Sequence, residues 1–197
     1  MTATLSADRR YRYVLERTWQ PSLLGGREGH VHWCCFNPSV ADEANDDPTL
    51  RRLIGFSERF GFSKLRLVNL FAFRATDPAD LPSQLEVATG PENDRAIDAE
   101  LAAGPGLVIA AWGAIRSPPA APKSAAKDFA ERAEAVLARL AREHEVFCLK
   151  TTKRGAPNHP VRLPYEIAPR WPTLFRARAS ASADGGVLPD LHDERPP

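Results

Sequence analysis

The sequence has little cysteine, since its 197 residues include only Cys34, Cys35 and Cys148. Three thiols cannot build the disulfide framework of a small secreted domain, and two of them are neighbours whose side chains would point to opposite faces of a strand. They also fall short of the thiolate set of an ordinary iron–sulfur cluster, and no CxxC spacing marks a zinc site. We therefore expect a reducing, cytoplasmic setting and no cofactor.

The sequence also lacks an excess of either charge and any long apolar run. Its 26 Lys and Arg residues nearly balance 25 Asp and Glu residues, which gives a formal net charge of +1. Nucleic acid or an anionic membrane would therefore need a local basic patch. No stretch approaches the roughly 20 apolar residues that span a bilayer, and the first ten residues have no apolar signal core, so we expect neither a membrane anchor nor export.

Several catalytic fingerprints are missing as well. The sequence contains no GxGxxG dinucleotide motif, no GxxxxGK[ST] phosphate loop and no GxSxG nucleophile elbow. These absences count against dehydrogenases, P-loop nucleotide hydrolases and α/β-hydrolases. The remaining composition, with 43% hydrophobic and 26% charged residues, is that of an ordinary globular protein.

Alternating strand and helix patterns predict a single α/β domain over residues 1–175, followed by a flexible tail over 176–197. Strands are expected at 11–19, 30–36, 64–71, 107–112 and 146–149, and helices at 49–60, between Pro91 and Gly104, and at 129–140. Parallel strands need crossover helices, so we expect a three-layer sandwich with a mainly parallel central sheet. The first two strands, joined by a turn, are predicted to form an antiparallel N-terminal pair.

In such sheets, ligands bind beyond the carboxyl ends of the strands. The loop after Phe36 carries Asn37, Asp42 and further acids up to Asp47. This loop is either a solvated turn in which Asp47 or Thr49 caps the next helix, a source of a general base that orients a water, or a hard-cation site. The EF-hand spacing is absent, and we predict no metal ligand here.

Two further strand ends carry candidate binding residues. Asn69 stands in an otherwise apolar strand end beside Phe71, and an unpaired amide there would cost about 1–3 kcal/mol. The amide either joins two loops or reads the edge of a nucleobase, because it offers both a donor and an acceptor. Trp112 and Gly113 form either core and turn or a flat wall beside a planar ligand.

The segment after the last predicted strand, KTTKRGAPNHP, brings cations and a histidine to the same edge. His159 is either a surface hydrogen-bonding residue or a catalytic group. Seven cations form either a phosphate-binding rim or a solvated basic face: Lys150, Lys153, Arg154 and Arg162, together with Arg51, Arg52 and Arg74 from other strand-end segments.

Five stretches resemble the bacterial and phage family catalogued as domain of unknown function 1643. They lie at 36–62, 67–81, 90–97, 108–114 and 152–164. The motifs are specific as a set, and the family brings no established activity. The sequence IRSPP after Trp112-Gly113-Ala114 departs from the His-Gly expected there in that family.

The order of four short motifs also resembles the uracil-DNA glycosylases. These motifs are FNPSVAD at 36–42, LVN at 67–69, AAWG at 110–113 and NHP at 158–160. The resemblance implies a glycosylase-like fold in which Asn37 or Asp42 positions a water, Asn69 reads the base and His159 assists its departure. The chain lacks the Gly-Gln-Asp start of the first motif and the Ser-Pro that follows the last one.

We therefore expect a nucleobase-containing ligand or nucleic acid as partner, and an N-glycosylase as the leading function. The alternative is a noncatalytic module that binds a nucleotide or nucleic acid in the same pocket. A metal-dependent hydrolase that uses Asp42, Asp46 and Asp47 is the third hypothesis. The sequence predicts no oligomeric state.

Overall fold

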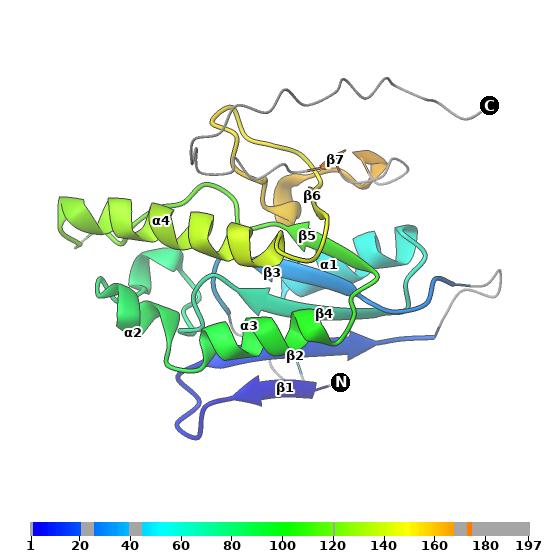
Figure 1. The fold of residues 1–197 in the computed structure, drawn as a ribbon, viewed down its shortest axis with the longest axis horizontal. Helices are drawn as coiled ribbons and strands as arrows, with labels where there is room; N and C mark the ends of the chain where they lie inside the picture. The colour runs from blue at the N-terminus through cyan, green and yellow to red at the C-terminus, as the bar shows by residue number, and fades with distance from the viewer. Residues whose placement is uncertain (1, 21–25, 40–44, 120, 168–172, 175–197) are drawn as a thin grey trace.

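The computed structural model describes residues 2–20, 26–39, 45–119, 121–167 and 173–174. The strands are β1 Thr2–Leu5, β2 Arg12–Thr18, β3 Val31–Cys35, β4 Lys64–Asn69, β5 Leu107–Ala110, β6 Val146–Cys148 and β7 Thr173–Leu174. The helices are α1 Pro48–Arg59, α2 Leu85–Thr89, α3 Asn93–Ala102 and α4 Lys123–Leu140, with 3₁₀ turns η1 Pro78–Asp80, η2 Pro160–Arg162 and η3 Tyr165–Ile167. Together the described residues form an α/β fold around one sheet (Figure 1).

The sheet has seven strands in the order β1-β2-β4-β3-β5-β6-β7. The central strands β4, β3, β5 and β6 are parallel, as predicted. The pairs β1–β2, β2–β4 and β6–β7 are antiparallel, so the sheet as a whole is mixed rather than mainly parallel. Helices connect the parallel strands because a crossover is needed to return the chain to the same end of the sheet.

An antiparallel pair is present at the N-terminus, but β1 and β2 form it. The prediction that the strands at 11–19 and 30–36 pair with each other is wrong, because β4 lies between β2 and β3. Every residue of β3 is buried, whereas β2 ends exposed. A strand that is buried throughout is stable at the centre of a sheet. Accordingly, β3 pairs with β4 along one edge and with β5 along the other.

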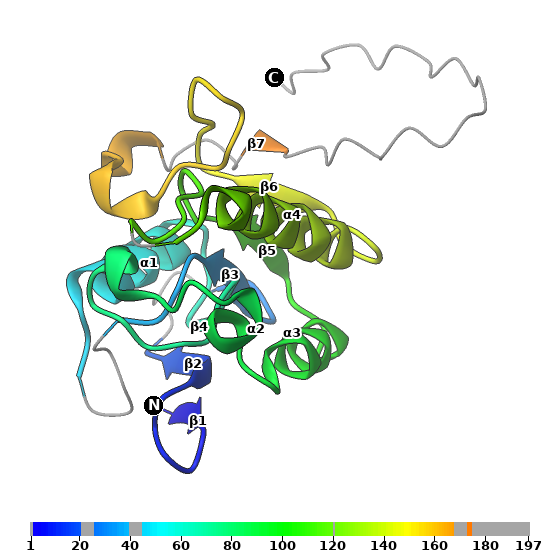
Figure 2. The same ribbon diagram turned by 90° about the vertical axis from the view of Figure 1, so that its left-hand side faces the viewer.

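Helices cover both faces of the sheet. Figure 2 shows α1 on one side of the strands and α3 and α4 on the other. Alternation along β3 sends Trp33 to the α1 face and Cys34 to the opposite face. Under α1, the Trp33 indole N–H donates to the Ser57 hydroxyl at 3.0 Å, so the polar position in the apolar stripe of this helix has a buried partner.

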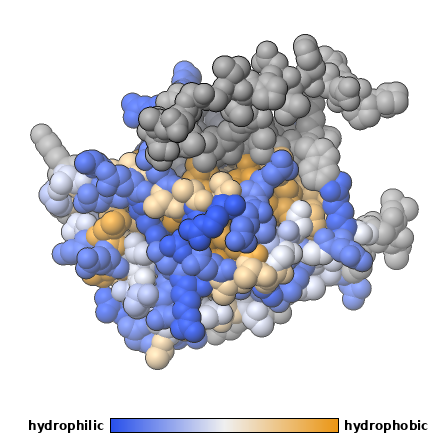
Figure 3. Space-filling view, in the orientation of Figure 1, coloured by the Kyte–Doolittle hydropathy of each residue, from blue (hydrophilic) through white to orange (hydrophobic). Residues whose placement is uncertain are grey.

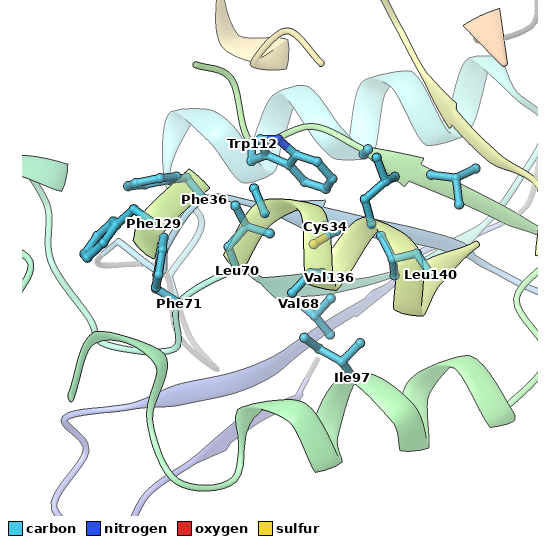
Figure 4. Packing of buried hydrophobic residues seen from close by; sticks show 14 of the residues in the cluster. Cys34, Phe36, Val68, Leu70, Phe71, Ile97, Trp112, Phe129, Val136 and Leu140 are labelled. Carbon is cyan, nitrogen blue, oxygen red and sulfur yellow. The ribbon is translucent and has the colours of Figure 1, made fainter. Parts of the chain in front are cut away.

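The larger apolar cluster lies beneath α3 and α4 (Figure 4). Val68 and Ile97 contribute to it from β4 and α3, while Phe129, Val136 and Leu140 contribute from α4. The surface on this side is largely hydrophilic, with some hydrophobic residues in view between the polar ones (Figure 3). Among the described residues, no helix is both long and apolar enough to cross a membrane.

The strand registers bring three carboxyl ends to one edge of the sheet. Cys35 of β3 pairs with Asn69 of β4, and Cys34 pairs with Ala110 of β5. The segments that follow β3, β4 and β5 therefore leave the sheet side by side. This is the edge at which α/β proteins bind ligands.

Candidate functional site

A cavity of about 620 Å³ lies at this edge. Its wall includes Asn37 after β3, Asn69 at the end of β4, Trp112 and Gly113 after β5, and His159 after β6. The structure thus brings together five of the residues singled out in the sequence. The volume is in the range of small-molecule binding sites, about 300–1,000 Å³.

Asn69 is the most unusual group in the wall. Asn69 is only 1% exposed. Neither its Oδ1 nor its Nδ2 has a hydrogen-bond partner among the described residues. Leaving a buried amide unsatisfied costs about 1–3 kcal/mol. The amide adjoins a cavity, so a ligand that supplies a donor and an acceptor side by side would recover this cost.

Asn37 spans two loops. Its Nδ2 donates to the backbone oxygens of Pro38 at 3.0 Å and Ala75 at 2.8 Å. These bonds use both N–H groups and fix the side chain, so Oδ1 is the atom that can still act, as an acceptor. Such a fixed acceptor is suited to orienting a water or a ligand hydroxyl group.

His159 begins the η2 turn, where its Nδ1 accepts the Val161 N–H at 3.4 Å. In the neutral ring the proton is then on Nε2. Burial lowers the pKa of His159; nearby Asp47 acts in the opposite direction and Arg162 adds to the lowering. The lowered pKa favours the neutral imidazole, which can donate from Nε2.

Gly113 allows the loop with His159 to approach closely. Its φ is +78°, in the left-handed region, and a Cβ added there would lie 3.3 Å from the His159 Cβ. The Gly113 N–H donates to the Pro157 oxygen at 2.9 Å, which joins the segments after β5 and β6. Glycine at this position therefore sets the width of the cavity between these two segments.

Arg12 is a cavity residue that the sequence reasoning missed. It is only 2% exposed, and burial lowers its pKa to about 10, with Asp47 acting in the opposite direction, so it remains a cation at pH 7. The β1–β2 register shifts at this point, because Leu5 pairs with Arg12 whereas Thr4 pairs with Val14. Such irregularities redirect side chains, and no local pattern in the sequence marks this one.

The two carboxylates in the described part of the wall act as caps. Asp47 accepts the Leu50 N–H at 2.7 Å at the start of α1, and Asp77 accepts the Ala79 N–H at 2.9 Å at the start of η1. The sequence predicted Asp47 or Thr49 as the cap of this helix, and the structure shows Asp47. One terminal N–H group of each element is thereby satisfied.

Five predicted site residues are not among the described residues that line the cavity. Phe71 is fully buried in the core, 5.1 Å from the Phe36 ring and 4.6 Å from the Phe129 ring between centroids (Figure 4). The others are Arg74, which donates to the Arg9 backbone oxygen, Lys153 and Arg154, which are exposed and not part of the cavity wall, and Asp42, which is outside the described residues.

Among the described residues, Arg162 is the one member of the predicted basic rim that lines the cavity, and Arg116 is a second arginine there that was not predicted. Arg116 and Arg162 line the cavity and are exposed. The segments after β5 and β6 carry them, so any anion that enters the cavity would meet these two side chains rather than Lys153 or Arg154. Arg116 also follows a strand end, that of β5, and this position is the signal by which sequence reasoning could have found it.

Two of the three acids proposed for a metal-dependent hydrolase are among the described residues, and both have other contacts. Asp46 forms an ion pair with Arg17 at 2.8 Å, and Asp47 caps α1. Within the described ranges, no group of three or more His, Cys, Asp or Glu side chains is arranged to hold a metal ion.

A family model described as "Protein of unknown function (DUF1643)" matches residues 12–161. The match begins at Arg12 and runs past His159, so it spans the strand ends that build the cavity. Neither the curated proteins nor the solved structures contain a match to the chain. The resemblance to uracil-DNA glycosylases therefore has no support from these comparisons.

Proposed function

We propose that this chain, which belongs to the DUF1643 family, binds a nucleobase in the cavity and hydrolyses its N-glycosidic bond. The observation that carries the proposal is the buried, unpartnered amide of Asn69 in the cavity wall. An amide that pairs with an edge carrying one donor and one acceptor discriminates among bases. The indole of Trp112 in the same wall is suited to contact with a planar ring.

The other cavity residues are suited to stabilise the charges that develop when a glycosidic bond breaks. Breaking the bond leaves positive charge on the sugar and negative charge on the departing base. The neutral His159 donates from Nε2 to the base as it leaves. The attacking water is held either by Oδ1 of Asn37 or by Asp42. In a duplex substrate, the target base must first flip out of the helix into the cavity.

Release of free base from a defined panel tests this function. The panel holds nucleosides, nucleotides and oligonucleotides that contain uracil or other altered bases, and chromatography detects the product. We expect Asn69→Ala to lose discrimination among bases, and His159→Ala to lower kcat by at least about tenfold with a smaller change in KM. Lys127→Ala, which removes an exposed α4 side chain, is the control and should match the parent.

A noncatalytic nucleotide-binding module is the second candidate. It is favoured by the two capping carboxylates, because Asp47 and Asp77 already use an oxygen for backbone N–H groups. In this case the parent protein would bind members of the panel and leave every glycosidic bond intact. That result would refute the glycosylase proposal and retain the recognition role of Asn69.

A further inference from the structure

We infer that Asn93 and Arg132 are positioning residues that hold Asn69 in the orientation needed to discriminate among bases. The inference rests on the proposed function of the cavity. Asn93 is at the start of α3 and Arg132 is within α4. Neither is among the described residues that line the cavity. Both act on the backbone at the end of β4.

The backbone at this point needs partners from outside the sheet. β4 ends at Asn69, so the carbonyl groups of Asn69 and Leu70 are beyond the regular ladder. The Asn93 Nδ2 donates to both carbonyl oxygens, at 3.1 Å each. The Arg132 Nε donates to the Leu70 oxygen at 3.0 Å. One buried amide and one buried guanidinium group thus hold the turn that follows Asn69.

The contacts are enclosed and mutually supported. Asn93 and Leu70 are 0% exposed and Arg132 is 9% exposed. Arg132 Nη1 forms an ion pair with Asp94 Oδ1 at 2.6 Å, so the guanidinium is anchored to the residue next to Asn93. From the sheet, the Leu70 N–H donates to the Cys35 oxygen at 2.9 Å. The peptide is therefore held from β3, α3 and α4 together.

This arrangement matters because, within the part of the chain that the structure describes, the Asn69 side chain has no hydrogen-bond partner. Its orientation depends on the position of its backbone and on packing. Binding groups discriminate well only when the surrounding residues hold them close to the productive geometry. Loosening the turn should therefore blur the choice between base edges while the cavity itself persists.

The test compares two pairs of variants. Asn93→Ser and Arg132→Met remove donors to the turn. Arg139→Met is the matched control, because Arg139 also joins α4 to α3, through Asp94 and Asp98, without contacting the turn. Arg132→Lys keeps the charge beside Asp94 and should restore part of the loss.

Two measurements are made on each folded variant, well below its unfolding temperature. The side-chain ¹⁵N–¹H₂ signals of Asn69, assigned by their loss in Asn69→Ala, report its orientation directly. Calorimetry with adenosine, cytidine, guanosine and uridine gives the ratio between the weakest and the tightest Kd. We expect Asn93→Ser and Arg132→Met to shift the Asn69 signals and to reduce the ratio by at least about fivefold, and Arg139→Met to change neither.

Signals and ratios that match those of Arg139→Met would overturn the inference. A changed affinity for every nucleoside with an unchanged ratio would also overturn it, since that is the effect of general destabilisation. If the parent binds no nucleoside, the proposed function fails. The Asn69 signals then still decide whether Asn93 and Arg132 position its side chain.

Discussion

Two buried polar side chains, near opposite ends of the parallel strands, differ in what surrounds them. Asn69 at the carboxyl end of β4 and His32 near the amino end of β3 both lack hydrogen-bond partners among the described residues. Asn69 stands in the wall of the cavity. His32 is 0% exposed and is not part of that wall.

An unsatisfied buried polar group next to a cavity can bind a ligand, whereas one sealed in the core affects only the stability of the fold. The Asn69 amide has no charge to lose, so it can be satisfied only by a partner other than the described residues, and it adjoins a cavity that could hold one. His32 can avoid a charge by remaining neutral: burial, together with smaller effects of His30, His144 and Arg66, lowers its pKa to about 3. One end of the sheet is thus suited to binding, and the other makes the fold sensitive to acid.

The largest predicted effect is loss of stability in acid. The folded pKa of His32 is about 3 and that of His30, lowered mainly by burial, about 4, against an ordinary 6.5. The unfolded chain therefore takes up protons first as pH falls. The stabilisation is complete above pH 6.5 and is lost toward the folded pKa values, by up to about 1.4 kcal/mol per pH unit for each ring. Urea unfolding at pH 7, 6 and 5 measures this slope.

His32→Leu isolates the contribution of one ring. We expect its free energy of unfolding to fall by about 1–2 kcal/mol less than that of the parent between pH 7 and pH 5. Carboxylates elsewhere in the chain affect both proteins equally. Equal slopes in the two proteins would show that His32 has no abnormal pKa and would remove one side of the comparison.

The next effect concerns Asn69 and has the opposite sign from most core substitutions. Replacing Asn69 by Leu removes an unpaired buried amide at similar volume, so the free energy of unfolding should rise by about 1 kcal/mol while nucleoside binding is lost. Asn93→Leu is the control, because its Nδ2 donates to two carbonyl oxygens and its loss should destabilise the fold. If both variants lose similar stability, Asn69 is satisfied in the folded protein and the cavity argument fails.

Local signals predicted much of this arrangement. Apolar spacing and a capping acid located α1, and the runs of β-branched and aromatic residues located the central strands. The rule that ligands bind at the carboxyl ends of parallel strands selected Asn37, Asn69 and His159, which are 32 to 122 positions apart in the chain and line one cavity. These features depend on neighbouring residues or on a general property of the fold.

Features set by long-range pairing were not predictable in the same way. The insertion of β4 between β2 and β3 depends on which strand buries both faces, and a strand pattern does not specify its neighbour. The face that Arg12 presents depends on a register shift with β1, a strand that was not predicted. Asn93 and Arg132 look like ordinary polar helix residues until α3 and α4 are placed over the end of β4.

The smallest predicted effect tests whether the close approach of Gly113 to His159 holds the imidazole in place. Gly113→Ala places an L residue at φ +78° and a methyl group 3.3 Å from the His159 Cβ. Gly104→Ala is the matched control, since its φ is +72° and a Cβ there meets no atom within 4 Å. Both variants should lose about 1 kcal/mol of unfolding free energy, from the backbone alone. Only Gly113→Ala should move the pKa of His159, measured by NMR titration, upward toward its ordinary value, because the contact displaces the ring from its buried position. An unchanged His159 pKa would mean that the loop absorbs the methyl group, and the close approach at Gly113 would then have no part in holding the imidazole.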